Sequence, residues 1–203
     1  MFRRSLIVLT FGLLFTPLVS ADPAAEQFAQ GLIDQGLAIL RDESAGDAGR
    51  RARFHAFLVQ HVDARKTALF TLGQYRRSAD EATLTTFTDV FRDYAMAIYE
   101  SKLERNKASS LKVVGSVDHK PGDVTVNARA ESPEGREPVR LAVRLMRSGG
   151  VYKIVDVQAE GIWLSVEQRD QFATFLSKNN GDVSALMNHL RSQTSRMRMA
   201  SAG

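Results

Sequence analysis

Apolar residues recur at helical spacing through the first half of the chain. Between Ala24 and Leu40 they form one stripe, in which Gly36 leaves a gap, and this pattern predicts an amphipathic helix. A polar linker is expected over residues 42–49, where glycines interrupt the pattern. A second helix is predicted over residues 53–62.

Capping signals mark two more helices in this half. Asp63 is placed to cap a helix that stops near Gly73. Ser78 and Glu81 have the spacing of a reciprocal capping box at the start of a long helix, which is expected to run to about Arg105. Aromatic residues repeat on one side of this helix, so that side should be buried against another part of the protein.

After residue 106 the period of the pattern changes to two. Apolar and polar side chains alternate over residues 111–117, 124–130 and 139–146, and a fourth strand is expected over residues 151–159. Such alternation is typical of strands that bury one face. Pro and Gly residues separate the segments, so the strands are expected to form an antiparallel meander whose apolar face needs a hydrophobic partner.

Two helices are predicted to follow the strands. A second capping box begins at Ser165, and Asp182 is placed to cap the last helix. The fold class is therefore α+β, with N-terminal helices, a twisted antiparallel sheet of four to five strands, and C-terminal helices. We expect a single domain over residues 22–192 and a disordered basic tail over residues 193–203.

The first 21 residues have the pattern of a cleaved secretory signal. Arg3 and Arg4 precede an apolar run over residues 6–18, and small residues lead up to Ala21. The run is too short to span a bilayer, which requires about 20 apolar residues. We therefore expect residues 1–21 to be a signal peptide that is removed on export.

Composition and charge narrow the classes of function. The 203 residues include no cysteine, which excludes disulfide scaffolds and cysteine zinc sites. The formal net charge is +4, and two of the arginines lie in the predicted signal, so the exported domain is too weakly basic to indicate nucleic-acid binding. Three arginines alternate onto the polar face of the predicted sheet, where they could dock acidic partner surfaces or lipid phosphate, or could simply be solvated: Arg129, Arg140 and Arg144.

The sequence contains no pattern that indicates catalysis or metal binding. It lacks a nucleophile elbow, a P-loop, a dinucleotide-binding glycine pattern and a zinc-protease helix motif. The four histidines do not pair at ligand spacing. Asp156 and Glu160 are the only candidates for acid–base chemistry, and the alternative is that they bond local groups and fix the turn at Gly161. We predict no catalytic residue, no metal site and no cofactor.

Two separated segments carry a resemblance to a known family. The first runs from Leu72 to Glu81 and continues with Phe87, Phe91 and Tyr99, and the second runs from Val155 to Ile162 and continues with Arg169, Phe172, Gly181 and Leu186. Together they resemble the MlaC family of periplasmic phospholipid carriers, also called toluene-tolerance auxiliary proteins. Arg76, Trp163 and Gln168 stand where that family commonly has tryptophan, serine and tyrosine. The segment that follows Gln168 is closer to its hopanoid-associated branch, HpnM.

The resemblance implies a periplasmic lipid carrier with a deep apolar pocket between sheet and helices. Such a carrier shuttles phospholipid between an outer-membrane lipoprotein complex and an inner-membrane ABC transporter with its substrate-binding subunit. This transport supports outer-membrane lipid asymmetry and solvent tolerance. The bound lipid is then cargo and not a cofactor. Two alternatives stay open, namely a carrier linked to hopanoids and a non-lipid periplasmic adaptor of similar fold.

Apolar positions of the sheet and helices become candidate pocket residues on this interpretation, and a filled core is the alternative for each of them. Trp163, the only tryptophan, is predicted to line or cover the pocket mouth near the lipid headgroup, and the alternative is that it packs the strand–helix corner. The predicted lipid-binding residues are Leu69, Leu72, Phe87, Phe91, Tyr94, Val126, Ala128, Val143, Leu145, Val155, Val157, Ile162, Trp163 and Phe172.

Overall fold

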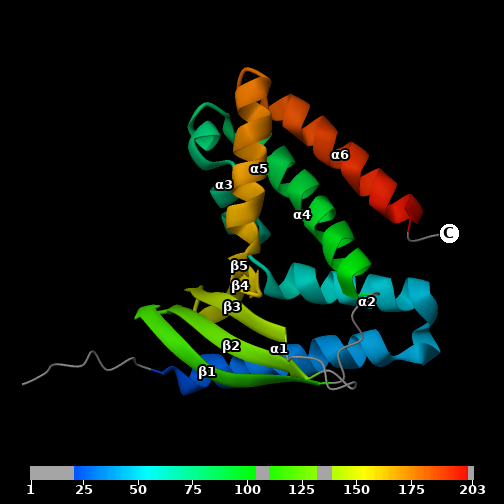
Figure 1. Cartoon of the computed structure of the whole chain (residues 1–203), viewed down its shortest axis with the longest axis vertical. Coiled ribbons are helices and arrows are strands. Elements are labelled where there is room, and N and C mark those ends of the chain that lie inside the picture. Colours follow the sequence, from blue (N-terminus) through cyan, green and yellow to red (C-terminus); the bar gives the residue numbers. More distant parts are fainter. Residues whose placement is uncertain (1–20, 104–109, 132–138, 201–203) are drawn as a thin grey trace, which may run out of the picture.

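The computed structural model describes residues 21–103, 110–131 and 139–200. The predicted signal peptide, apart from Ala21, lies outside the described residues. The described chain combines helices with an antiparallel sheet (Figure 1), which confirms the α+β fold class. None of its helices is long and apolar enough to cross a membrane.

The elements follow one another in the order that the sequence pattern predicts. The helices are α1 (Pro23–Arg41), α2 (Gly46–His61), α3 (Ala64–Thr71), α4 (Glu81–Leu103), α5 (Leu164–Lys178) and α6 (Val183–Ala200). Two short 3₁₀ helices precede α2 and α4, namely η1 (Glu43–Ala45) and η2 (Gly73–Arg77). The strands are β1 (Ser110–Lys120), β2 (Asp123–Glu131), β3 (Val139–Ser148), β4 (Val151–Ala159) and β5 (Ile162–Trp163).

Each strand of the sheet pairs antiparallel with the next strand in the chain. The register places Val126 opposite Val143, and Val143 opposite Val157, so these side chains share one face of the sheet. Thr125 and Arg144, which are also opposite each other, lie on the other face. The sheet therefore has one apolar and one polar face, as the alternation predicts.

Helix α1 covers one end of the apolar face. Ala25 and Ala29 are buried in one cluster with residues of β2, β3 and β4, because their small side chains let the helix approach the strands closely. Asp22 caps α1 by accepting a hydrogen bond from the Ala25 N–H at 2.9 Å, and it also accepts one from the Tyr152 hydroxyl of β4. The cap thus ties the first turn of α1 to the sheet.

Strand β1 is an edge of the sheet, and α1 covers part of that edge. The Gln30 side chain accepts a hydrogen bond from the Val113 N–H at 2.9 Å and donates one to the Leu111 carbonyl at 3.3 Å. Gln30 therefore takes the place of a neighbouring strand at two backbone groups. A register shift between Val113 and Gly115 adds a bulge that interrupts the edge further.

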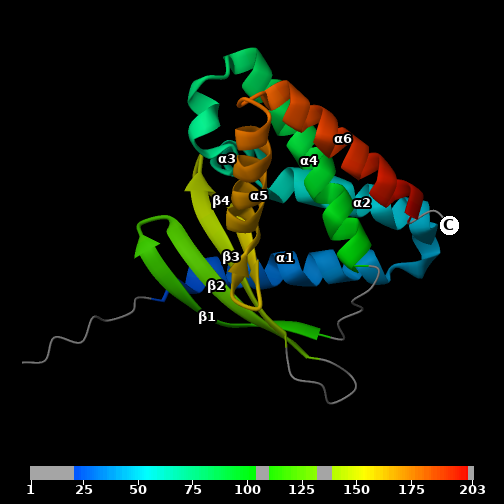
Figure 2. The ribbon, with the colours of Figure 1, turned by 45° about the horizontal axis from the view of Figure 1, so that its top comes forward.

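Helix α2 turns back beside α1 to complete a helical hairpin (Figures 1 and 2). The linker predicted over residues 42–49 is wrong from Gly46 onward, because α2 already begins there. An ion pair between Arg50 and Asp47 supports this polar first turn. The predicted Asp63 cap of α3 is confirmed, since its side chain accepts a hydrogen bond from the Lys66 N–H at 2.9 Å.

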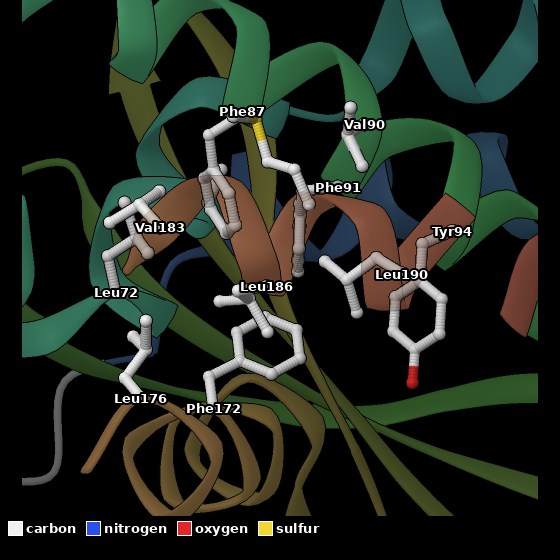
Figure 3. Packing of buried hydrophobic residues seen from close by; sticks show 12 residues of the cluster. Leu72, Phe87, Val90, Phe91, Tyr94, Phe172, Leu176, Val183, Leu186 and Leu190 are labelled. Carbon is white, nitrogen blue, oxygen red and sulfur yellow. The ribbon is translucent and has the colours of Figure 1, made fainter. Parts of the chain in front are cut away.

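Helices α3 to α6 form a separate layer with its own core (Figure 3). The Phe172 ring of α5 lies edge-on to Phe87 and Phe91 of α4, with ring centroids 6.2 and 6.3 Å apart. Leu186 and Leu190 of α6 are fully buried in the same cluster. The aromatic side of α4 is therefore buried, as predicted, and its partners are α5 and α6.

Helix α4 begins at Glu81 and not at Ser78. The Asp80 side chain accepts a hydrogen bond from the Thr83 N–H at 2.7 Å. Ser78 instead ends η2, where its hydroxyl donates to the Tyr75 carbonyl at 2.9 Å, and Asp80 takes the capping role. The capping box predicted from Ser78 is therefore wrong.

The cap of α5 also differs from the prediction, although the helix begins next to Ser165, at Leu164. Asp156 of β4 accepts a hydrogen bond from the Ser165 N–H at 3.0 Å and another from the Ser165 hydroxyl. A carboxylate from a neighbouring strand thus satisfies the N-terminus of the helix, and a local capping box from Ser165 does not form.

The last helix ends later than predicted. Asp182 caps α6 as expected, by accepting hydrogen bonds from the N–H groups of Ser184 and Ala185 at 2.8 and 3.0 Å. The helix then continues through Ala200, so the prediction of a disordered tail is wrong for residues 193–200. The helix persists because Thr194 and Met197 continue its buried side, and residues 201–203 lie outside the described chain.

Candidate functional site

An apolar cavity of about 190 Å³ lies between α1, α2 and the apolar face of the sheet, and we call it the α1–α2 cavity. Every residue of its lining is apolar, so the cavity suits hydrocarbon and offers no charged side chain to a ligand. The lining residues are Ala29, Leu32, Ile33, Gly36, Leu37 and Leu40 of α1, Phe54 and Phe57 of α2, and Leu111, Val143, Leu145 and Ile154 of the strands.

Gly36 lets the α1 backbone lie close to the aromatic rings of α2 at the cavity wall. Leu32, Gly36 and Leu40 follow one another at four-residue spacing, so they lie on one side of the helix. A β-carbon added at Gly36 would lie 3.5 Å from the Phe57 ring and 3.9 Å from the Phe54 ring. The gap in the apolar stripe of the sequence therefore corresponds to part of the cavity wall.

His61 packs against the aromatic side of the α1–α2 hairpin. Its ring lies 4.9 Å from the Phe57 ring and 6.5 Å from the Phe28 ring, measured between centroids. The Nε2 atom is buried and has no hydrogen-bond partner among the described residues. Burial, and secondly the charge of Lys153, lower the pKa of His61, so the ring adjoins the cavity wall as a neutral group at neutral pH.

Only part of the predicted site lines this cavity. Val143 and Leu145 do so. Val126 and Ala128 are buried on the same face of the sheet, and Val157 is half-buried beside Val143. These three residues belong to the apolar face but not to the cavity lining.

The predicted helical residues lie elsewhere. Leu72, Phe87, Phe91, Tyr94 and Phe172 form the filled core of the α3–α6 layer (Figure 3). The structure therefore does not bring them together with the cavity-lining valine and leucine of β3. The alternative considered for these residues, a packed core, is the arrangement that is found.

The remaining predicted residues are distributed around β4, β5 and α3. Leu69 is half-buried on α3, and Val155 is buried in β4. Ile162 is 57% exposed. Trp163 is half-buried at the N-cap of α5, which places it at the predicted strand–helix corner and outside the cavity lining.

Sequence reasoning missed the contribution of α1 and α2 to the site. The signals were present, because the stripe between Ala24 and Leu40 and the pair Phe54 and Phe57 are visible as helical patterns. Periodicity shows that such a stripe is buried but not which surface it faces.

The two candidate carboxylates have structural partners. Besides Ser165, Asp156 accepts a hydrogen bond from the Val157 N–H at 2.9 Å. Glu160 accepts one from the Arg140 N–H at 2.8 Å, and its own N–H donates to the Arg140 carbonyl. These contacts agree with the structural alternative. In the described parts of the chain, no group of three or more potential ligands is arranged to hold a metal ion.

The three arginines predicted for docking lie on the polar face of the sheet but in different environments. Arg144 donates to both carboxylate oxygens of Asp123 at 2.9 Å. Arg129 and Arg140 are exposed and directly opposite each other on β2 and β3. Arg144 is therefore committed to an ion pair, whereas the other two point to solvent.

The chain combines an α+β fold with an apolar cavity, which is the arrangement of a domain that can hold an apolar ligand. The family described as "MlaC protein" matches residues 30–192, and the chain belongs to this family. A phospholipid-binding protein from Ralstonia solanacearum, solved in complex with a phospholipid, has the same fold, with a TM-score of 0.75. The two are 22% identical, and the match covers 86% of this chain and 98% of that chain. No curated protein matches this sequence.

Proposed function

We propose that the protein is a periplasmic lipid carrier that holds acyl chains in the α1–α2 cavity. The observation that carries the proposal is the wholly apolar lining of this cavity in a chain of the MlaC family. The predicted signal peptide over residues 1–21 accounts for export. The carrier exchanges lipid with an outer-membrane lipoprotein complex and with the substrate-binding subunit of an inner-membrane ABC transporter, and so maintains outer-membrane asymmetry.

Energetics explain why such a carrier is needed. Two acyl chains contain about 30 methylenes, and at roughly 0.8 kcal/mol each their transfer to water costs on the order of 20 kcal/mol or more. Free diffusion of the lipid between two membranes is therefore negligible. An apolar cavity recovers much of this free energy, and the transfer requires no catalytic residue.

Phospholipid is the proposed cargo. The phospholipid complex of the Ralstonia solanacearum protein supports this choice, since the two proteins share a fold. Lipid extracted from the protein after purification from the periplasm, and identified by mass spectrometry, tests it directly. Phospholipid supports the proposal, a hopanoid identifies the hopanoid-linked carrier, and the absence of lipid favours the adaptor.

Substitutions at Gly36 test whether the α1–α2 cavity is the binding site. Gly36→Leu projects a side chain into the cavity beside Phe57 and is expected to reduce bound lipid at least fivefold, while the protein still folds. Gly36→Ala is the matched control: its β-carbon makes ordinary contacts, so bound lipid should be retained. Replacing a helical glycine by alanine should also stabilise α1 by up to about 1 kcal/mol.

Circular dichroism and thermal unfolding establish that both variants fold, and lipid content per protein is then compared. Full lipid loading in a folded Gly36→Leu protein would place the acyl chains elsewhere. A second variant, Val143→Gln, approaches the cavity from the sheet and should give the same loss.

A further inference from the structure

Three cations form a line across three neighbouring strands on the polar face of the sheet. Lys112 of β1 is directly opposite Arg129 of β2, and Arg129 is directly opposite Arg140 of β3. Residues that are directly opposite in an antiparallel pair share a face, so the three side chains lie on the same side at intervals of about 5 Å. All three are exposed, and we call them the cationic row.

The cationic row is not neutralised within the described parts of the chain. Its three side chains make no ion pair or side-chain hydrogen bond there. Glu160 lies next to the row, but its carboxylate accepts the backbone N–H of Arg140. Arg144, further along the same face, shows the contrasting case, because Asp123 binds it through two hydrogen bonds.

Such a row is unfavourable for the isolated sheet. Like charges directly opposite each other on neighbouring strands repel. The positive potential that they create attracts a negatively charged partner and speeds its encounter. Arginine also matches carboxylates with two parallel hydrogen bonds.

The cationic row lies on the opposite face of the sheet from one end of the α1–α2 cavity. Leu111 lines the α1–α2 cavity and immediately precedes Lys112 in β1. Successive residues of a strand point to opposite faces, so the row lies across the sheet from this end of the cavity. The three strands that carry it are neighbours in the sheet, and β1 and β2 lie on the side away from α3 to α6 (Figure 2).

We propose that the cationic row docks a carboxylate-bearing surface of a protein that exchanges lipid with this chain. The inference rests on the proposed carrier function and adds the location and the chemistry of one partner interface. A protein surface fits better than a bilayer, because the neighbouring row of Asn127, the buried Ala142 and Gln158 has no large apolar side chain, and the exposed valines near the cations, Val114 and Val139, lie on different strands and form no continuous patch. Stable attachment to a bilayer needs buried apolar side chains in addition to a few cations.

The test uses the full chain in the cells that produce it. A photo-crosslinking residue replaces Asn127, because the side chain at this position lies on the same face of the sheet as the cationic row. We expect a crosslink to one protein, at a peptide rich in Asp and Glu. The triple variant Lys112→Glu, Arg129→Glu, Arg140→Glu should reduce this crosslink at least tenfold. The control is a second triple variant with the same change in net charge at exposed helical positions: Arg77→Glu, Arg191→Glu, Arg196→Glu. It should change the crosslink yield less than twofold.

Charge-swap rescue completes the test. Lysines in place of the crosslinked partner's carboxylates should restore crosslinking to the triple variant. The proposal is overturned if Asn127 gives no crosslink, if the triple variant crosslinks normally, or if the swap fails. Cosedimentation with phosphatidylglycerol vesicles that is lost in the triple variant, without any protein crosslink, would assign the row to a membrane surface.

Two further readouts separate the possible failures. The triple variant should carry as much lipid as the wild type, because the cationic row is not part of the cavity. If the wild type itself carries no lipid, the proposed carrier function fails, and the crosslinking result still decides the docking site. The single variant Arg129→Gln removes both direct repulsions of the row, with Lys112 and with Arg140, and should raise the Tm slightly while weakening the crosslink. A lowered Tm would show that the row stabilises the sheet and is not an interface.

Discussion

At the scale of single residues, Asp123 is a buried carboxylate that is paired with an arginine. Its side chain is 3% exposed, and it receives two hydrogen bonds at 2.9 Å from Arg144, whose side chain is 43% exposed. The hydrogen bonds from Arg144 lower the pKa of Asp123, against the opposing effect of burial. The ionised carboxylate is therefore part of the native state.

Replacing Asp123 by Asn should destabilise the protein in a pH-dependent manner. At pH 7 we expect a loss of about 1 to 2 kcal/mol, at the low end for charged hydrogen bonds because Arg144 is partly solvated. Since the folded pKa lies below the ordinary value of 3.8, the stabilisation is complete above that value and is lost as the pH falls through the folded pKa. The difference between wild type and Asp123→Asn should therefore shrink below about pH 4.

Urea unfolding at several pH values measures this difference. Asp93→Asn serves as the control, because Asp93 is exposed, and it should change the unfolding free energy by less than about 0.5 kcal/mol. A difference for Asp123→Asn that is constant from pH 7 to pH 3 would contradict the role of the ion pair.

At the scale of elements, the edge of β1 depends on one side chain of α1. Gln30→Ala removes the partners of the Val113 N–H and the Leu111 carbonyl. We expect a loss of about 1 to 2 kcal/mol of unfolding free energy and greater aggregation at high concentration, because the edge becomes available to another strand. Thermal unfolding and light scattering check both effects.

Gln27→Ala provides the comparison on the same helix. Gln27 is exposed, so its replacement should leave both stability and aggregation nearly unchanged. Equal effects of the two substitutions would mean that Gln30 contributes only through α1 itself.

The elements were largely predictable from the sequence, whereas their partners were not. Periodicity located every strand from β1 to β4, and local caps such as Asp63 and Asp182 were found because a cap and its helix are adjacent in sequence. The start of α5 was predicted to within one residue, but its cap was not found, because Asp156 comes from β4. The same limit applies to the site, since the aromatic stripe of α4 and the stripe of α1 look equally buried in sequence.

At the scale of the whole molecule, the two apolar regions differ in how completely they are filled. The α3–α6 layer is a packed core whose residues Phe87, Leu176 and Leu186 have no exposed surface. The other region contains the α1–α2 cavity. Packing of this kind makes the helical layer resistant to deformation, so it is expected to be the more rigid of the two regions.

The volume of the cavity then determines where the molecule must move when it is loaded. A cavity of about 190 Å³ compares with the roughly 150 Å³ that accommodates one benzene in an engineered apolar cavity. Two acyl chains need far more space, and the filled α3–α6 core cannot provide it. On the proposed function, we therefore expect loading to displace α1 and α2 from the sheet.

Hydrogen exchange of delipidated and phospholipid-loaded protein tests this expectation. Amide protection should change in α1, α2 and β3, whose side chains line the cavity, and should change little in the core of α4, α5 and α6. The reason is that the acyl chains would replace contacts between the α1–α2 hairpin and the sheet, whereas the packing of Phe87, Phe91 and Phe172 is untouched. Changes concentrated in α4 to α6 would instead show that the lipid enters between these helices, and the site would then be the one that the aromatic stripe of the sequence predicts.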